Sequence, residues 1–93
     1  MIRSFRCRET ERIWSGFSSG KFPGDIQQRA LSKLRLLDAA SIVADLRSPP
    51  GNKLEALKGN RKGQFSIRIN QQWRICFRWN DGDADNVEIV DYH

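Results

Sequence analysis

The chain has few of the residues that build metal centres and disulfide frameworks. Its 93 residues include two cysteines and one histidine. A structural zinc site uses four such ligands, and a single cysteine pair is too little for a disulfide framework. We therefore predict no metal and no cofactor, and we interpret Cys7 and Cys76 as buried, reduced thiols.

Long apolar runs are missing as well. No stretch approaches the roughly 18 apolar residues of a membrane-spanning helix, and Arg3 and Arg6 stand where a signal peptide would be apolar. These features predict a soluble, cytoplasmic protein that does not contact a membrane. Hydrophobic residues make up 39% of the chain, which is enough for one compact core, and we expect a single domain over residues 1–93.

Acidic residues are almost absent from the middle of the chain, although the whole chain carries a net charge of only +5. Residues 47–79 hold eight Lys and Arg and one acidic residue, Glu55, whereas residues 80–93 hold five acidic residues and no Lys or Arg. Clustered cations release counterions from phosphates, so the middle segment is a candidate surface for a polyanion. The alternative is a basic face that is merely solvated.

Hydrophobic periodicity predicts helices in the first half of the chain and strands in the second. One helix is expected from about residue 8 to 16. Another is expected to follow Pro23 and to continue in a shorter form until Pro49 and Pro50 stop it. Strands are expected at residues 2–6, 54–57, 65–70, 73–79 and 87–92.

The apolar residues of segments 65–70 and 73–79 all stand at odd positions. The position numbers of directly opposed residues in an antiparallel pair have a constant sum, and this sum must be even if both apolar sets are to face one side of the sheet. A three-residue loop meets this requirement, and it pairs Arg68 with Arg74. Like charges opposed on neighbouring strands destabilise a sheet unless an anion lies between them. The sequence therefore predicts a phosphate clamp.

The last hairpin is expected to place Arg78 opposite Glu88 and Arg74 opposite Tyr92. Strict alternation puts Asp91 on the apolar face, together with the last residue of the chain, so a bulge or a curled end would have to turn both outward. The Asp81-Gly82 pair would also fit another register.

Metal-free cleavage of RNA needs a base for the 2′-hydroxyl, cations for the phosphate and an acid for the 5′-oxygen. The candidate cations are Arg68, Arg74 and Lys58. The candidate proton-transfer groups are Glu55, Asp91, Tyr92 and His93. A phenol would need the cations to lower its pKa from about 10. The alternative is that Tyr92 packs at the sheet edge and His93 is a frayed end.

Four segments together resemble one toxin family. They are LRSPPGNKLEALKG at residues 46–59, GQFSIRIN at 63–70, QWRI at 72–75 and VEIVDYH at 87–93. The chain resembles the HigB toxins of the RelE/ParE superfamily, also called plasmid maintenance system killer proteins. The resemblance implies an α+β fold, a small antiparallel sheet with two N-terminal helices on one face in the order β-α-α-β-β-β.

The same resemblance implies a toxin of a bacterial type II toxin–antitoxin system that cleaves mRNA in the ribosomal A site without a metal. Its partners would be the ribosome with its 16S rRNA, mRNA, and a HigA-like helix-turn-helix antitoxin in a higher-order oligomer. Two alternatives stay open. One is a ParE-like toxin that binds a protein such as DNA gyrase, and the other is a non-catalytic RNA-binding module.

By matching position, Arg68 and Arg74 would bind the scissile phosphate, Lys58 would support charge or position RNA, and residues 91–93 would form the C-terminal catalytic group. Further contacts to RNA or the ribosome are expected from Arg47, Lys53, Arg61, Lys62 and Arg78. Some relatives have a histidine where this chain has Glu55. That position therefore cannot play the same acid-base role here unless a carboxyl group substitutes for the imidazole. This shifts weight to Tyr92 and His93 as the proton-transfer groups.

Overall fold

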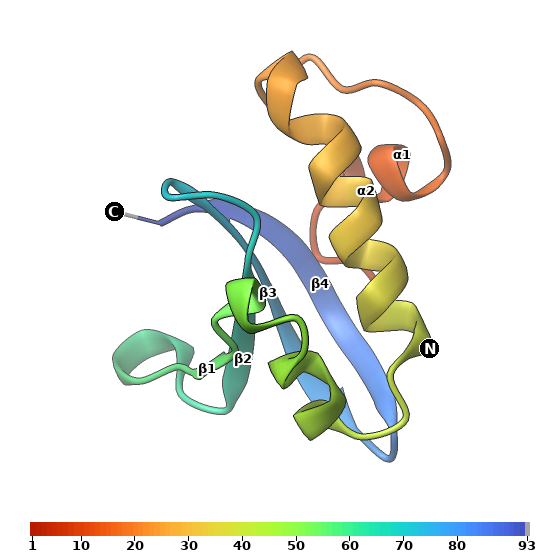
Figure 1. Ribbon diagram of the computed structural model, residues 1–93. Helices are drawn as coiled ribbons and strands as arrows, with labels where there is room; N and C mark the ends of the chain where they lie inside the picture. Colours follow the sequence, from red (N-terminus) through yellow and green to blue (C-terminus); the bar gives the residue numbers. More distant parts are fainter. Residues whose placement is uncertain (93) are drawn as a thin grey trace.

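The computed structural model describes residues 1–92, with two helices beside a sheet (Figure 1). The helices are α1 (Arg8–Trp14) and α2 (Gly24–Ala39). The strands are β1 (Glu55–Ala56), β2 (Gln64–Arg68), β3 (Trp73–Asn80) and β4 (Asp83–Asp91). Single 3-10 turns lie between α2 and β2, at Val43–Arg47, Pro50–Asn52 and Gly59–Arg61. The predicted site residue His93 lies outside the described residues.

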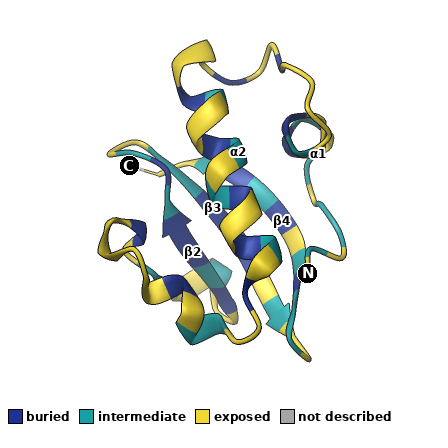
Figure 2. Ribbon diagram, turned by 45° about the vertical axis from the view of Figure 1, so that its right-hand side comes forward, coloured by how far each residue is buried: buried dark blue, intermediate teal, exposed yellow. Residues whose placement is uncertain are grey.

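The four strands form one antiparallel sheet in the order β1-β2-β3-β4. Both helices cover the same face of this sheet, which confirms the predicted α+β arrangement (Figure 2). The odd-numbered apolar residues of β2 and β3 pack under the helices, and three tryptophans pack against the same core as predicted. No helix among residues 1–92 is long and apolar enough to cross a membrane.

Helix α2 is held to the sheet by the stripe that its sequence predicts. The buried members of the stripe are Ile26, Ala30, Leu34 and Leu37. Full burial of a leucine side chain contributes roughly 1.5–3 kcal/mol, so this stripe anchors the helix. The opposite side of α2 is exposed, as Figure 2 shows, and carries Arg29 and Arg35.

The N-terminal segment is not the strand that its alternation predicted. It makes only two isolated parallel bridges to the edge of β4, from Ile2 to Ala84 and from Phe5 to Val87. Between these bridges the backbone of β4 bulges at Asn86, whose N–H donates to Ser4 Oγ (2.9 Å) instead of to a backbone carbonyl. A continuous ladder cannot form across such a bulge.

The loop between β2 and β3 has the predicted register. Arg68 lies opposite Arg74, and the Ile69 N–H donates to the Trp73 carbonyl (2.9 Å) across the three-residue loop. The side chain of Asn70 accepts hydrogen bonds from the backbone N–H groups of Gln72 and Trp73, both at 2.8 Å. This internal bonding fixes the loop beside the arginine pair.

The predicted register of the last hairpin is wrong, by two residues at Arg74 and by three at Arg78. Arg74 lies opposite Val90 instead of Tyr92, and Arg78 lies opposite Asp85 instead of Glu88. The two-residue turn at Asp81-Gly82 has positive φ at both residues (49° and 82°), as type I′ turns require. With a two-residue turn, the position numbers of opposed residues have an odd sum, so the apolar residues of the two strands would face opposite sides of the sheet. The extra residue of the bulge in β4 makes the sum even again and keeps the apolar residues on the core side.

The two cysteines differ in environment. Cys76 is buried, as predicted, and burial raises the pKa of its thiol. Cys7 is only half-buried, against the prediction, because it directly precedes the surface helix α1 and packs at the edge of the core.

Candidate active site

Arg74 is fixed on the sheet face opposite the helices. Its Nε donates to Ser66 Oγ (2.7 Å), and its Nη2 donates to the carbonyls of Ser66 (3.3 Å) and Lys53. Ser66 is completely buried in β2. A guanidinium with several fixed partners keeps one orientation, which suits it to hold a phosphate in a defined position.

Lys53 contributes its backbone to this arrangement. It follows the Pro50–Asn52 turn and adopts the left-handed conformation, with φ of 47°. Such a conformation is unfavourable for a residue with a Cβ and is common at functional sites. Here the carbonyl of the strained residue accepts the hydrogen bond from Arg74.

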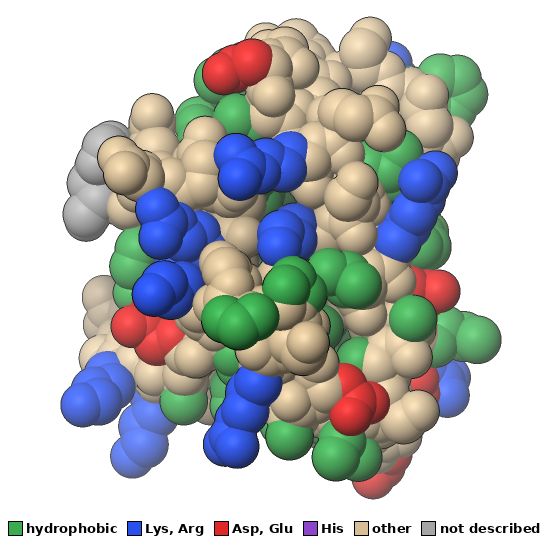
Figure 3. All heavy atoms as spheres, in the orientation of Figure 1, with side chains coloured by type: hydrophobic (Ala, Val, Ile, Leu, Met, Phe, Trp, Pro, Cys, Tyr) green, Lys and Arg blue, Asp and Glu red, His purple; other side chains and the backbone are tan. Residues whose placement is uncertain are grey.

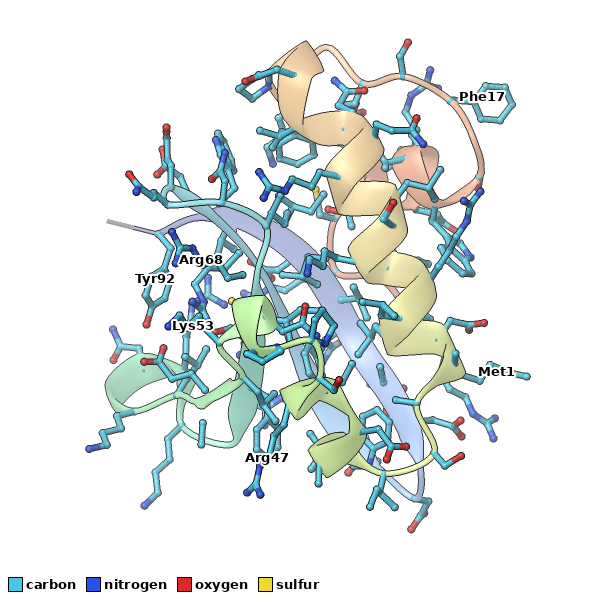
Figure 4. All side chains as sticks on the ribbon, in the orientation of Figure 1. Met1, Phe17, Arg47, Lys53, Arg68 and Tyr92 are labelled. Atoms are coloured by element: carbon cyan, nitrogen blue, oxygen red, sulfur yellow. The ribbon has the colours of Figure 1, made fainter. Side chains whose placement is uncertain are left out.

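Tyr92 lies against Arg74, directly after the end of β4. The Arg74 guanidinium carbon is 5.4 Å from the centre of the Tyr92 ring, and the Tyr92 hydroxyl donates to Glu55 Oε1 (3.1 Å). The Tyr92 N–H also donates to the Gln72 carbonyl (2.6 Å), which ties the end of the chain to the loop between β2 and β3. Figure 4 shows Tyr92, Arg68 and Lys53 on the same side of the molecule.

The pKa of Tyr92 is raised, not lowered as the sequence analysis expected. The main cause is the hydrogen bond to Glu55, and the negative charge of Glu55 adds to it, whereas the charge of Arg74 acts in the opposite direction. Tyr92 therefore keeps its proton and is a hydrogen-bond donor at neutral pH.

A cleft of about 310 Å³ brings three of the predicted site residues together. It is lined by Glu55, Ala56, Leu57, Lys58 and Tyr92. The exposed side chain of Lys58 places a positive charge beside the Tyr92–Glu55 pair. The cleft thus combines a cation, a carboxylate and a phenol, with Arg74 against the ring of the phenol.

Comparison with known families places the chain in a class of toxins. Residues 3–93 match the family model described as the RelE-like toxin of the type II toxin-antitoxin system HigB. The chain belongs to this HigB-like toxin family. Toxin HigB-1 of Vibrio cholerae serotype O1 is 52% identical over 67 residues, which cover 72% of this chain and 70% of that protein.

Endoribonuclease HigB of Proteus vulgaris is 34% identical over 94 residues, which cover 100% of both chains. Among solved structures, two YoeB–YefM complexes from Staphylococcus aureus contain a similar chain, with TM-scores of 0.58 and 0.59. Each alignment covers 100% of this chain and 98% of the other, at 19% and 18% identity. At that identity the likeness shows a shared fold.

Among the described residues predicted for the site of this HigB-like toxin, Arg74 adjoins the cleft through the Tyr92 ring, and two others lie outside it. Arg68 is the pairing partner of Arg74, but its Nε donates to the Asn70 carbonyl (3.0 Å), and it lines a separate pocket beside α2. Asp91 lies opposite Trp73 and is exposed at the end of β4, and its Oδ2 accepts from Gln72 Nε2 (3.1 Å), so it bonds to the loop instead of lining the cleft.

The predicted RNA-contacting residues of the toxin fall into two groups. Four are exposed, namely Arg47, Lys53, Lys62 and Arg78. Arg61 is half-buried, and its guanidinium contacts Glu88 Oε1 (3.3 Å) and Gln64 Oε1 (3.1 Å). Arg61 therefore neutralises Glu88 beside the buried Cys76. Figure 3 shows Lys and Arg side chains gathered over the sheet side and the adjoining part of α2.

The sequence analysis missed Ser66 as part of the site. Ser66 is the small residue between Gln64 and Arg68 on the polar face of β2, and it lies diagonally across from Arg74. A small side chain at this place leaves room for the guanidinium and supplies its acceptor. The sequence did contain an indication of this role, because Ser66 is the one small residue in a strand of large residues and lies near the predicted Arg68.

Proposed function

We propose that this HigB-like toxin is an endoribonuclease that cleaves mRNA in the A site of the ribosome and so inhibits translation. The observation that carries the proposal is the contact chain from Ser66 through Arg74 and Tyr92 to Glu55. It places a fixed cation beside two groups that can exchange a proton. Catalysis by RNA's own 2′-hydroxyl needs this combination.

In the proposed reaction, Glu55 accepts the proton of the 2′-hydroxyl, and the 2′-oxygen attacks the adjacent phosphorus. The bond from phosphorus to the 5′-oxygen breaks, and Tyr92 donates its proton to that oxygen. The products are a 2′,3′-cyclic phosphate and a 5′-hydroxyl. The hydrogen bond between Tyr92 and Glu55 then returns the proton from the carboxyl group to the phenolate, which resets the site.

Charge on the phosphate is stabilised by the cations around the cleft. In this proposal Arg74 binds the scissile phosphate and Lys58 adds positive charge at the rim of the cleft, whereas Arg68, across the strand pair from Arg74, binds RNA beside the cleft. Asp91 and His93 flank Tyr92 in the sequence and serve as further proton-transfer candidates of the C-terminal group. The other exposed cations, Arg47, Lys53, Lys62 and Arg78, contact RNA backbone in this proposal.

The proposed partners follow from the same activity. The toxin, as a single domain over residues 1–93, acts in the bacterial cytoplasm on mRNA and the 16S rRNA of the ribosome. A HigA-like helix-turn-helix antitoxin restrains it in a higher-order complex. The solved YoeB relatives were both determined with their partner YefM, which supports pairing with an antitoxin.

The test is cleavage of a defined mRNA in a translating extract, mapped by primer extension. Arg74→Ala and Tyr92→Phe should each slow cleavage by about 100-fold or more, since each removes a group that acts on the reacting atoms. Arg35→Ala, an exposed arginine of α2, is the matched control and should leave the rate unchanged.

Two outcomes would contradict the proposal. Stalled DNA replication with intact mRNA would indicate a ParE-like toxin that acts on DNA gyrase. RNA binding with no cleavage by the unmodified toxin on ribosomes would indicate a non-catalytic RNA-binding module.

A further inference from the structure

A second cationic pocket lies between α2 and the loop that joins β2 to β3. Its volume is about 410 Å³. It is lined by Arg29, Lys33, Gly51, Arg68, Ile69, Asn70 and Gln71. Arg29 and Lys33 are one turn apart on α2, so both side chains reach the same hollow. The sequence analysis assigned no role to either of them.

The charges in this pocket are unbalanced. Three cations face it, and no acidic side chain is among its described lining residues. Two of the cations donate hydrogen bonds to neutral oxygens. Lys33 Nζ donates to Asn52 Oδ1, and Arg68 Nε donates to the Asn70 carbonyl. Like charges gathered without a counter-charge favour the binding of an anion.

Lys33 shows the effect of this imbalance. Its pKa is lowered, mainly because partial burial disfavours the ammonium form and further because of the charge of Arg29. A bound anion would oppose both effects, since its negative charge and hydrogen-bond acceptors favour the ammonium form.

The pocket is linked to the candidate active site through the pairing of Arg68 with Arg74. Arg68 lines the pocket and lies directly opposite Arg74 on the paired strand. A ligand that spans both places must therefore carry negative charge at intervals, as a nucleic-acid backbone does. The neutral polar groups of Asn70 and Gln71 suit the ribose and base edges beside such a phosphate.

We propose that the pocket of Arg29, Lys33 and Arg68 binds an RNA backbone phosphate other than the scissile one. The proposal rests on the proposed function, because it takes the phosphate at Arg74 as the reacting one. The pocket then sets the direction and register of the RNA strand across the sheet.

The experiment compares the double variant Arg29→Gln/Lys33→Gln with the double control Arg12→Gln/Arg35→Gln. The control removes two exposed helix cations, from α1 and α2, that do not line the pocket. The probe is a short single-stranded RNA with 2′-O-methyl groups, which cannot be cleaved, and binding is measured by fluorescence anisotropy over a range of salt.

The pocket variant should bind this RNA about tenfold more weakly, because two charged phosphate contacts are lost. The slope of log affinity against log salt should fall by about 0.7, the value for one phosphate of a single strand. Arg29→Gln alone should show part of the loss. Arg29 is exposed, so this single variant guards against misfolding at Lys33.

Two ribosome arms distinguish the source of the phosphate. Weaker binding to ribosomes without mRNA assigns the phosphate to ribosomal RNA, whereas a loss seen only with mRNA in the A site assigns it to the message. Equal affinity and equal salt slope of the pocket and control variants in every arm would overturn the proposal.

The two proposals fail in different ways. If the unmodified toxin cleaves mRNA while the pocket variant binds and cleaves like the control, the pocket proposal is wrong and the proposed function stands. If the unmodified toxin cleaves nothing but loses RNA affinity through Arg29 and Lys33, the proposed function is wrong and the pocket binds phosphate nevertheless.

Discussion

The hydroxyl of Tyr92 donates to Glu55 Oε1 at 3.1 Å, although the two residues belong to opposite edges of the sheet. Glu55 is in the edge strand β1, and Tyr92 follows the other edge strand, β4. Their side chains meet on the face that carries Arg74 and Ser66 of the central strands. The bond therefore joins the two edges over the residues that hold the phosphate in the proposed reaction.

Glu55→Gln should lower the pKa of Tyr92 toward its ordinary value of about 10. The reason is that the variant removes the negative charge that holds the phenolic proton. Tyr92 is the single tyrosine of the chain, so its ionisation can be followed by tyrosinate absorbance or by NMR of the labelled ring. Glu11→Gln, an exposed glutamate of α1, is the control. An unchanged titration in Glu55→Gln would contradict the assigned hydrogen bond.

The same bond predicts how cleavage depends on pH at the alkaline end. The pKa of Tyr92 in the folded toxin is raised, so the stability that the bond contributes is fully present below about pH 10. It is lost as pH rises through the pKa of the folded state. Cleavage that needs the phenolic proton should fall over that same range. Glu55→Gln also removes the proposed base and should cleave far more slowly, but the fall of its residual activity should begin at lower pH, and a fall at the same pH would exclude Tyr92 as the titrating acid.

Ser66→Ala should reduce kcat about tenfold with a smaller effect on KM. The variant removes the acceptor that fixes Arg74 Nε at 2.7 Å, and a misplaced guanidinium stabilises the transition state less well than a fixed one. The free energy of unfolding should fall by about 1 kcal/mol from the lost hydrogen bond. Single-turnover cleavage and urea unfolding measure the two effects, with Ser32→Ala on exposed α2 surface as control. Normal kcat in Ser66→Ala would show that Arg74 needs no positioning.

Local pattern was sufficient to predict the pairing of β2 with β3. Side chains alternate strictly along a strand, so the odd positions of the apolar residues determined the loop length and placed Arg68 opposite Arg74. The last hairpin was not predictable in the same way. After a two-residue turn, a bulge is needed to bring the apolar residues of both strands to the core side, whereas a longer loop would do so without a bulge. The residue pattern alone does not say which of the two occurs, and the structure has a bulge at Asn86.

In the candidate site, too, the features that depend on local sequence were predictable, and those that depend on distant contacts were not. The sequence predicted Arg74, Tyr92 and Glu55 as participants, because residue type and order suffice to name them. The direction of the pKa shift of Tyr92 depends on which partner its hydroxyl meets. That partner comes from the opposite edge of the sheet, 37 residues away, and periodicity carries no information about such a contact.

Leu34→Ala should destabilise the toxin far more than Leu36→Ala on the same helix. Leu34 is completely buried between α2 and the sheet, whereas Leu36 is 39% exposed. A cavity at a buried leucine costs about 2–5 kcal/mol, and truncation at a largely exposed site costs less than about 1 kcal/mol. Urea unfolding of the two variants measures the difference. Equal losses would place α2 in a different rotation on the sheet.

Asn86→Val should destabilise the β3–β4 hairpin, whereas Asn86→Gly should be nearly neutral. Asn86 has φ of 53°, a conformation that glycine adopts freely and a β-branched residue adopts only with strain of about 1–3 kcal/mol. The bulge sets the register that carries β4 to Tyr92, so the valine variant should also cleave more slowly at temperatures where it stays folded. Urea unfolding and exchange of the Arg3 and Arg6 amides, which donate to the carbonyls of Ala84 and Val87, measure the destabilisation, and single-turnover cleavage measures the loss of rate. Slower cleavage in the glycine variant would mean that the Asn86 side chain, and not the bulge, supports the site.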